Sequence, residues 1–145
     1  MFKNQKEWEE GFKYSVIYSR QNIKLTEVMG LEYVDSNFEE KSVTYRFSSK
    51  DYYENQFEGV QGAIPAAILE VACGVVANTI AGEKDSSLMD IHVSYINKLT
   101  MADEIIAKVY LVKAGRTIIR TRAEIYDKNS GKLAVSAVVC SFANQ

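Results

Sequence analysis

The first regular pattern of apolar side chains along the chain is helical. Trp8, Phe12 and Val16 recur every four residues, as residues on one face of a helix do. This spacing predicts a helix over about residues 4–21. More mixed residues follow and end in a turn signal, Asp35-Ser36-Asn37.

The pattern then changes to alternation. Val43, Tyr45 and Phe47 alternate with polar side chains, which predicts a half-buried strand after a weaker strand signal near Leu31. Four further strand signals close the chain, at about residues 88–96, 104–112, 117–126 and 133–142. Because the connections between these four look short, we expect them to form an antiparallel meander.

Between the two groups of strands lies a segment that is apolar all round and predicts a helix over about residues 63–81. Pro65 suits its first turn, and Gly82 supplies a stop. The segment is about long enough to span a bilayer, but its alanine content, Pro65, Gly74 and the mid-segment Glu70 argue against that. A helix this apolar belongs inside a curled sheet and requires a further covering surface, for which we expect a second subunit.

Composition adds limits to this picture. The 145 residues, 47% of them apolar, fit a single domain over 1–145. A net charge of −2 gives no electrostatic case for nucleic acid or for an anionic membrane. Cys73 and Cys140 form no CxxC or Cys/His cluster, and the charged N-terminus has no signal-peptide pattern, so we expect a cytoplasmic protein with reduced thiols.

Glu70 is the main candidate for chemistry. Burying an unpaired carboxylate costs several kcal/mol, so a retained one is usually paired or functional. Two alternatives stay open from the spacing alone: Glu70 faces a local gap at the surface, or it pairs with a lysine or arginine.

The entrance of the long helix is the second candidate. Gly59 and Gly62 allow close approach of a ligand to the backbone, and the helix start offers free N–H donors for an oxyanion. Asn55 and Gln61 flank this entrance and can orient a water or a carbonyl. A tight loop-to-helix turn and ordinary loop capping explain the same residues without a ligand.

The other polar residues give weaker evidence for a functional site. His92 is the only histidine, with no partner for a metal site or a triad, so we expect no metal. The turn at Gly115 and Arg116 lies among late basic residues, and it is either a contact for a phosphate-bearing ligand or a solvated face of the sheet.

Taken together, the residues resemble a known family. The chain is similar to the hotdog-fold thioesterases, in particular the small acyl-CoA thioesterases related to the phenylacetate-pathway enzyme. Their signature is similar to N-x-x-x-G-x-H-G-G, with an acidic residue eight positions after the first glycine of HGG. These positions hold, in order, Asn55, Gly59, Gln61, Gly62, Ala63 and Glu70. The resemblance runs from about Asn22 to Phe142 and includes a strand ending in SYINK.

The resemblance implies an α+β hotdog fold, in which an antiparallel sheet of about six strands wraps around the central helix. It also implies a homodimer, often paired into a dimer of dimers, with active sites at the interface. In such enzymes the helix carboxylate, here Glu70, acts as general base or nucleophile. The N–H of Gly62 stabilises the oxyanion, and Asn55 orients the water or the carboxylate. Gly59, Ala63, Gly115 and Arg116 are then expected to contact substrate.

Two positions depart from the family pattern, because Gln61 replaces the usual histidine and Ala63 the second glycine. Gln61 donates a hydrogen bond but takes no proton. The function expected is hydrolysis of an acyl-CoA or acyl-carrier-protein thioester without a cofactor. The alternative is a non-catalytic hotdog protein that binds acyl-CoA as a sensor or scaffold. A hotdog dehydratase is a weaker third option, because His92 lies in the wrong segment.

Overall fold

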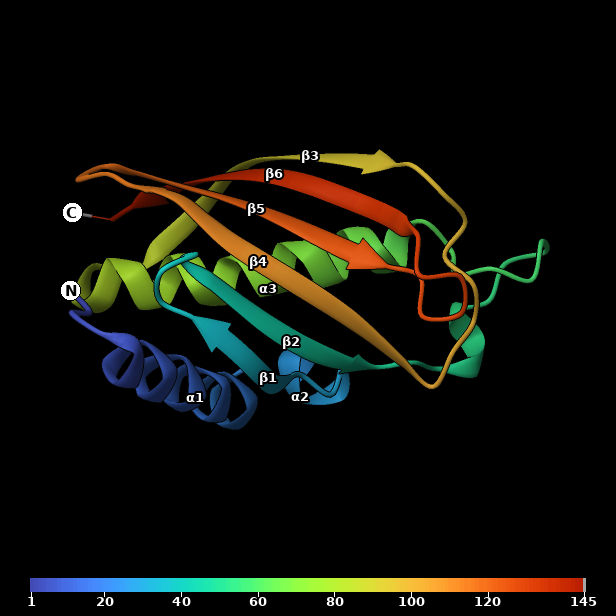
Figure 1. The fold of residues 1–145 in the computed structure, drawn as a ribbon, viewed down its shortest axis with the longest axis horizontal. Coiled ribbons are helices and arrows are strands. Elements are labelled where there is room, and N and C mark those ends of the chain that lie inside the picture. The colour runs from blue at the N-terminus through green and yellow to red at the C-terminus, as the bar shows by residue number, and fades with distance from the viewer. Residues whose placement is uncertain (145) are drawn as a thin grey trace.

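The computed structural model describes residues 1–144, in which one long helix lies against a curled antiparallel sheet (Figure 1). The helices and strands are α1 (Gln5–Asn22), α2 (Lys24–Val28), β1 (Glu32–Asn37), β2 (Ser42–Ser48), the 3₁₀ helix η1 (Asp51–Tyr53), α3 (Ala63–Ala81), the 3₁₀ helix η2 (Gly82–Lys84), β3 (Ser86–Tyr95), β4 (Glu104–Ala114), β5 (Ile118–Tyr126) and β6 (Leu133–Ala143).

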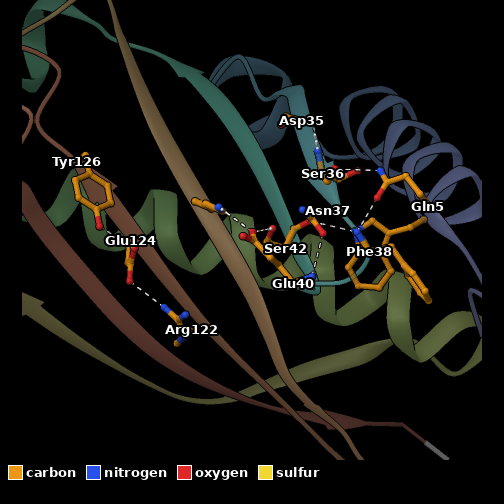
Figure 2. A network of polar contacts seen from close by, with 12 residues as sticks. Gln5, Asp35, Ser36, Asn37, Phe38, Glu40, Ser42, Arg122, Glu124 and Tyr126 are labelled. Atoms are coloured by element: carbon orange, nitrogen blue, oxygen red, sulfur yellow. Dashed lines mark hydrogen bonds and ion pairs between the residues drawn. The ribbon is translucent and has the colours of Figure 1, made fainter.

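α1 is docked on the sheet by its first turns. The side chain of Asn4 caps the helix by accepting from the N–H of Glu7. Trp8 is buried, and its Nε1 donates to the carbonyl of Ser42 over 3.1 Å. The side chain of Gln5 donates to the carbonyl of Ser36 and accepts from the N–H of Phe38 (Figure 2). These two hydrogen bonds connect α1 to the β1–β2 turn. The N-terminal helix therefore belongs to the same core as the sheet.

The sheet has six strands in the order β1-β2-β4-β5-β6-β3. The predicted fold class is confirmed, but the four-strand meander is wrong for its first member, because β3 pairs with β6 and not with β4. The segment 96–103 makes this crossover. Strands lie about 4.8 Å apart, so three spacings are about 14 Å, and eight extended residues reach about 27 Å. The connection that looked short is long enough to cross the sheet.

Two local expectations are also corrected. Asp35-Ser36-Asn37 is the end of β1 rather than a turn, and the chain reverses at 38–41 instead. The register between β1 and β2 shifts between Tyr33 and Asp35, which breaks the alternation that marks a strand. The mixed residues before β1 contain α2, a single short helix without a side-chain cap, and no sequence signal marked it.

α3 forms the centre of the core. Ile68, Leu69, Ala72 and Cys73 are buried against the sheet. It ends at Gly82, whose φ of +65° is open to glycine at little cost. The segment Ala63–Lys84 has the length and composition of a membrane-spanning helix. In this structure it lies behind the sheet and packs against it as a core helix (Figure 1).

One face of α3 is left open. It is only half-buried or exposed, and apart from one carboxylate and one amide it consists of small and apolar residues: Ala63, Ala67, Glu70, Val71, Gly74 and Asn78. The sheet covers the opposite face of the helix. This open face is the surface for which the sequence required a second cover.

Candidate functional site

The loop from Asn55 to Gly62, called the entry loop below, leads into α3 and is held on both sides. The N–H of Val60 donates to the carbonyl of Leu99, and the N–H of Gln61 to that of Tyr53, over 2.8 and 2.7 Å. A Cβ on Gly59 would lie 3.1 Å from the side chain of Lys98, so this close approach of two loops favours glycine. Gly59 is thus explained by packing.

The other side of this contact is fixed by Asp127 at the β5–β6 turn. Its Oδ1 accepts from the N–H and the hydroxyl of Thr100, at 2.8 and 2.6 Å, and its Oδ2 accepts from the N–H of Ser130. Thr100 in turn forms a β-bridge with Gly59. A buried carboxylate in a distant turn therefore positions the segment against which the entry loop rests.

The oxygen and the nitrogen of the Asn55 side-chain amide have different surroundings. Its Oδ1 accepts from the N–H groups of Phe57 and Gly59, at 2.8 and 3.2 Å, which is the loop capping that the sequence left open as an alternative. Within residues 1–144, its amide nitrogen has no hydrogen-bond partner. Asn55 therefore shapes the loop with its oxygen and offers its NH₂ group to a ligand.

The start of α3 is a donor site. Gly62 is the N-cap residue, no side chain caps the helix, and no acidic residue lies in the first turn. The backbone N–H groups of Gly62 and Ala63 donate to no acceptor in the described part of the chain, and the next but one residue, Pro65, has no N–H. Two unsatisfied donors at the positive end of a helix dipole suit a developing oxyanion.

A cleft of about 450 Å³ opens beside these donors and is called the entry cleft. Asn55, Gly59, Gly62 and Pro65 line one side, and the other side is formed by the residues that follow β3: Tyr95, Ile96, Asn97, Lys98 and Leu99. Lys98 is the only charged side chain in this lining. The cleft thus combines free N–H donors with one cation.

Tyr95 and Lys98 were not predicted as site residues. Tyr95 ends β3, and its hydroxyl donates to the carbonyl of Gly62 over 2.7 Å. The ring of Tyr95 lies 3.4 Å from where a Cβ on Gly62 would be. The sequence signal was the SYINK segment, which the family resemblance matched but which no local pattern linked to the helix entrance 33 residues earlier.

Glu70 lies on the open face of α3, half-buried, and does not line the entry cleft. No ion pair or hydrogen bond engages its carboxylate within residues 1–144, so the predicted alternative of a lysine or arginine partner is not realised in the protomer. Eight residues separate Gly62 from Glu70, which is about 12 Å along a helix. One protomer therefore does not bring the carboxylate and the oxyanion donors to a single carbonyl group.

Gln61 and Ala63 lie at the helix entrance but are exposed and do not line the entry cleft. The backbone of Gln61 is tied to Tyr53, whereas its side chain has no hydrogen-bond partner among residues 1–144. Both positions face away from the rest of their own protomer. They are accessible to whatever covers the start of α3.

Gly115 and Arg116 lie far from this region. Glu104, at the start of β4, pairs with Ser48 just before the entry-loop region. The eleven residues of β4 then lead about 33 Å away to the hairpin, which lies at the opposite end of the sheet (Figure 1). A Cβ on Gly115 would lie 2.6 Å from the carbonyl oxygen of Ile118, so a tight turn accounts for this glycine. Within one protomer the structure does not join these two residues to the site.

Other candidate chemistry is sparse. In the part of the chain that the structure describes, no group of three or more His, Cys, Asp or Glu side chains is placed to hold a metal. His92 is exposed on β3. Burial raises the pKa of Cys73 to about 12, so this thiol is not a nucleophile at neutral pH.

The arrangement can be compared with known proteins. Residues 60–134, slightly more than half of the chain, match the family model described as Thioesterase superfamily. The chain belongs to this superfamily. Among curated proteins, no sequence matches it significantly.

Several solved structures share the hotdog fold of this chain. The Escherichia coli PaaI protein from the phenylacetic acid degradation operon is 10% identical and has a TM-score of 0.80, covering 94% of this chain and 95% of its own. A phenylacetic acid degradation-related protein of Ralstonia eutropha is 16% identical, with a TM-score of 0.76 and coverages of 88% and 98%. A Streptococcus mutans protein bound to acetyl CoA is 15% identical, with a TM-score of 0.67 and coverages of 79% and 89%. The predicted likeness to the PaaI group is confirmed at the level of the fold.

Proposed function

We propose that this protein hydrolyses acyl thioesters of coenzyme A, or of an acyl-carrier protein, at a site formed by two protomers. The observation that carries the proposal is the free pair of N–H donors at Gly62 and Ala63, with an unpaired carboxylate, Glu70, two turns further along the same helix. Membership in the Thioesterase superfamily supports the reaction type. A neighbouring structure that holds acetyl CoA supports the thiol half of the substrate.

A dimer brings the Glu70 carboxylate of one protomer close to the oxyanion donors of the other, which lie too far apart within one protomer. In a two-fold interface, a contact from residue i to residue j is repeated from j to i. If Glu70 of one protomer faces Gly62 of the partner subunit, the axis passes near Ala66, midway between them, and the part of the open face from Ala63 to Glu70 covers its own copy. Ala63 and Ala67 permit close approach of two helices there.

The edge strand supports the same assembly. β3 is the last strand of the sheet, and its outer edge pairs with no other strand in residues 1–144. It carries exposed apolar side chains, among them Leu88 and Met89. An open edge is a template for pairing with another chain. We therefore propose a homodimer joined along β3, with pairing into a dimer of dimers as a further step, in the cytoplasm, where both cysteines stay reduced.

The reaction then uses the residues as follows. The Glu70 carboxylate takes a proton from a water molecule as the water oxygen attacks the thioester carbonyl carbon. The carbonyl electron pair moves to oxygen, which accepts hydrogen bonds from the N–H groups at the partner's α3 start. When the carbonyl re-forms, the C–S bond breaks, and the departing thiolate takes the proton from Glu70. The Asn55 amide and Gln61 donate hydrogen bonds, and Lys98 attracts the phosphates of the thiol half.

A second candidate keeps the ligand and omits the reaction. Gln61 stands where the family pattern has histidine, and it accepts no proton at neutral pH. On this alternative the protein binds acyl-CoA as a sensor or scaffold. Thiol release from a panel of acyl-CoAs separates the two, since the binding protein shows affinity and no turnover.

The test of the composite site uses two inactive variants. Glu70→Gln removes the base and is expected to lower kcat by about a hundredfold or more. Gly62→Pro removes one N–H donor, and the φ of −57° at this position already fits proline. Gly62→Ala keeps the N–H and is the matched control, because its Cβ would lie at an ordinary distance of 3.4 Å from Tyr95.

When Glu70→Gln and Gly62→Pro chains are mixed and refolded together, half of the dimers are mixed and one of their two sites is intact. About a quarter of the wild-type activity should return. No recovery in verified mixed dimers would contradict the composite site. Absence of thiol release by the wild type on every acyl-CoA tried would contradict hydrolysis itself.

A further inference from the structure

A second cavity, of about 670 Å³, lies between α1 and the C-terminal half of α3 and is called the α1–α3 groove. Tyr14 and Tyr18 of α1 line one wall, and Val75, Asn78 and Thr79 of α3 line the other. Its volume falls in the range of small-molecule sites, which extends from about 300 to 1,000 Å³. The site described above uses none of these residues.

The surface that the groove offers to a ligand is largely apolar. The hydroxyl of Thr79 donates to the carbonyl of Val75, and that of Ser15 donates to the carbonyl of Phe12. The Asn78 oxygen accepts from Ser86. These two hydroxyls and this oxygen are satisfied within the protein, so they make little demand on a ligand. The stacked rings of Tyr14 and Tyr18 add aromatic surface, with centroids 6.4 Å apart.

The groove is connected to the proposed base along α3. Glu70, Gly74 and Asn78 follow one another at intervals of four residues, so they form one stripe of the helix. Nothing lies within 4 Å of where a Cβ on Gly74 would be, which leaves open space between the carboxylate and the groove. The groove begins at Val75, about 7.5 Å along the helix from Glu70.

The two cavities therefore lie on opposite sides of Glu70. Gly62, which lines the entry cleft, is eight residues before it, and Asn78, which lines the groove, is eight residues after it. A thioester has two different ends, a large polar thiol half and an acyl half. The cleft with free N–H donors and Lys98 suits the first, and the apolar groove suits the second.

The far end of the groove is acidic. Glu83 and Asp85 are part of its lining, and the lining contains no lysine or arginine. A carboxylate carried on the far end of an acyl chain would be repelled there and would lose its hydration without a partner. The groove thus discriminates by charge as well as by length.

We propose that the α1–α3 groove binds the acyl group of the substrate and selects uncharged acyl groups of several carbons, aliphatic or aromatic, over acetyl groups and over long acyl groups that end in a second carboxylate. This inference rests on the proposed function. It assigns the acyl group to the protomer that supplies Glu70, and the thiol half to the partner's entry cleft.

The experiment measures kcat/KM for acetyl-, decanoyl- and hexadecanedioyl-CoA. Gly74→Leu fills the open space beside the stripe, and Tyr18→Ala removes one wall of the groove. Ile17→Ala is the matched control, because Ile17 is its exposed neighbour on α1 and lies outside the groove. The ratio of kcat/KM for decanoyl-CoA to that for acetyl-CoA should fall about tenfold or more in the first two variants and stay within twofold in the third.

A separate variant tests the selection against a second carboxylate. Glu83 is thirteen residues beyond Glu70, about 20 Å along a helix, and the far carboxylate of a sixteen-carbon dicarboxylic acyl group spans such a distance. Glu83→Lys should raise kcat/KM for hexadecanedioyl-CoA about tenfold and leave the value for decanoyl-CoA within twofold. Unchanged selectivity in Gly74→Leu, Tyr18→Ala and Glu83→Lys, in an enzyme that does hydrolyse thioesters, would overturn the groove assignment and leave the proposed function standing.

A wild type without turnover gives a different result. The proposed function then fails, and calorimetric titration with decanoate tests the groove by itself. Binding that weakens about tenfold in Tyr18→Ala and not in Ile17→Ala supports the groove, and absence of binding refutes it. Circular dichroism on each variant verifies folding, and because Tyr18 is more than half exposed its variant keeps the test available if Gly74→Leu does not fold.

Discussion

The hydroxyl of Tyr95 donates a hydrogen bond to the carbonyl of Gly62, at 2.7 Å, and so ties the last residue of the edge strand to the first turn of the central helix. The carbonyl belongs to the peptide whose N–H is that of Ala63, one of the two free donors at the helix start. The bond therefore holds the orientation of a donor in the proposed oxyanion site.

Tyr95→Phe should change activity more than stability. A hydrogen bond on a side chain that is more than half exposed contributes at most about 1 kcal/mol to the free energy of unfolding. A small rotation of the Gly62–Ala63 peptide, however, acts on the transition state, and we expect kcat to fall about tenfold. Tyr126→Phe is the control, because Tyr126 is similarly exposed and donates to Glu124 on the outer face of the sheet (Figure 2). Equal effects of the two variants on kcat would contradict a positioning role.

Asp127→Asn should destabilise the fold in a pH-dependent way. Burial alone would raise the pKa of Asp127, but hydrogen bonds from Thr100 and Ser130 outweigh it and lower the pKa to about 2. A pKa below the unfolded value contributes stability above about pH 4, and this contribution, about 2 kcal/mol, is lost as the pH falls towards 2. Urea unfolding at several pH values should therefore show a gap between wild type and variant that closes in acid. A gap independent of pH would contradict this origin.

Gly82→Ala and Gly74→Ala should shift thermal stability in opposite directions. Both glycines lie at or within α3, and nothing lies within 4 Å of a Cβ at either position. Gly82 has a φ of +65°, so alanine there is strained by about 1 kcal/mol or more. Gly74 lies in the helix interior, where alanine is favoured by up to about 1 kcal/mol. Shifts of the same sign in calorimetry would contradict the conformational explanation.

Cys73 should resist alkylation in the native protein. Burial raises the pKa of this thiol to about 12, which leaves almost no thiolate at pH 8. Iodoacetamide under native conditions should add at most one adduct per chain, at the partly exposed Cys140. Both cysteines should react in guanidinium chloride. Native labelling of Cys73, located by peptide mass spectrometry, would show that α3 separates from the sheet.

The strands and the two long helices followed from local patterns, whereas α2 and the order of the strands in the sheet did not. The apolar run up to Gly82 marked α3 because nothing else of that length lacks a polar face. The position of β3 beside β6 depends on where the segment 96–103 crosses the sheet, which no local period records. Similarly, the bulge near Tyr33 breaks the alternation of β1, so the pattern near Leu31 indicated this strand only weakly.

The residues of the candidate site likewise fall into two groups, those that their sequence spacing predicted and those that only the fold brings together. Asn55, Gly59 and Gly62 are close in sequence, and the structure gathers them in the entry cleft as their spacing suggested. Tyr95 and Lys98 reach that cleft from beyond α3, so only the tertiary fold joins them to it. Gly115 and Arg116 were assigned to the site because they form a turn among basic residues and fit the family resemblance, while the 11 residues of β4 carry them to the far end of the sheet.

Because two turns of helix separate Gly62 from Glu70, the hydrolytic activity depends on the concentration of the protein. On the proposed arrangement, an isolated chain holds one half of each of two sites and completes neither. Specific activity then falls on dilution below the dissociation constant of the dimer, where total rate grows with the square of protein concentration. Assembly thereby acts as a threshold: a cell with few copies of this chain has almost no activity, and one with a few times more has a disproportionate amount.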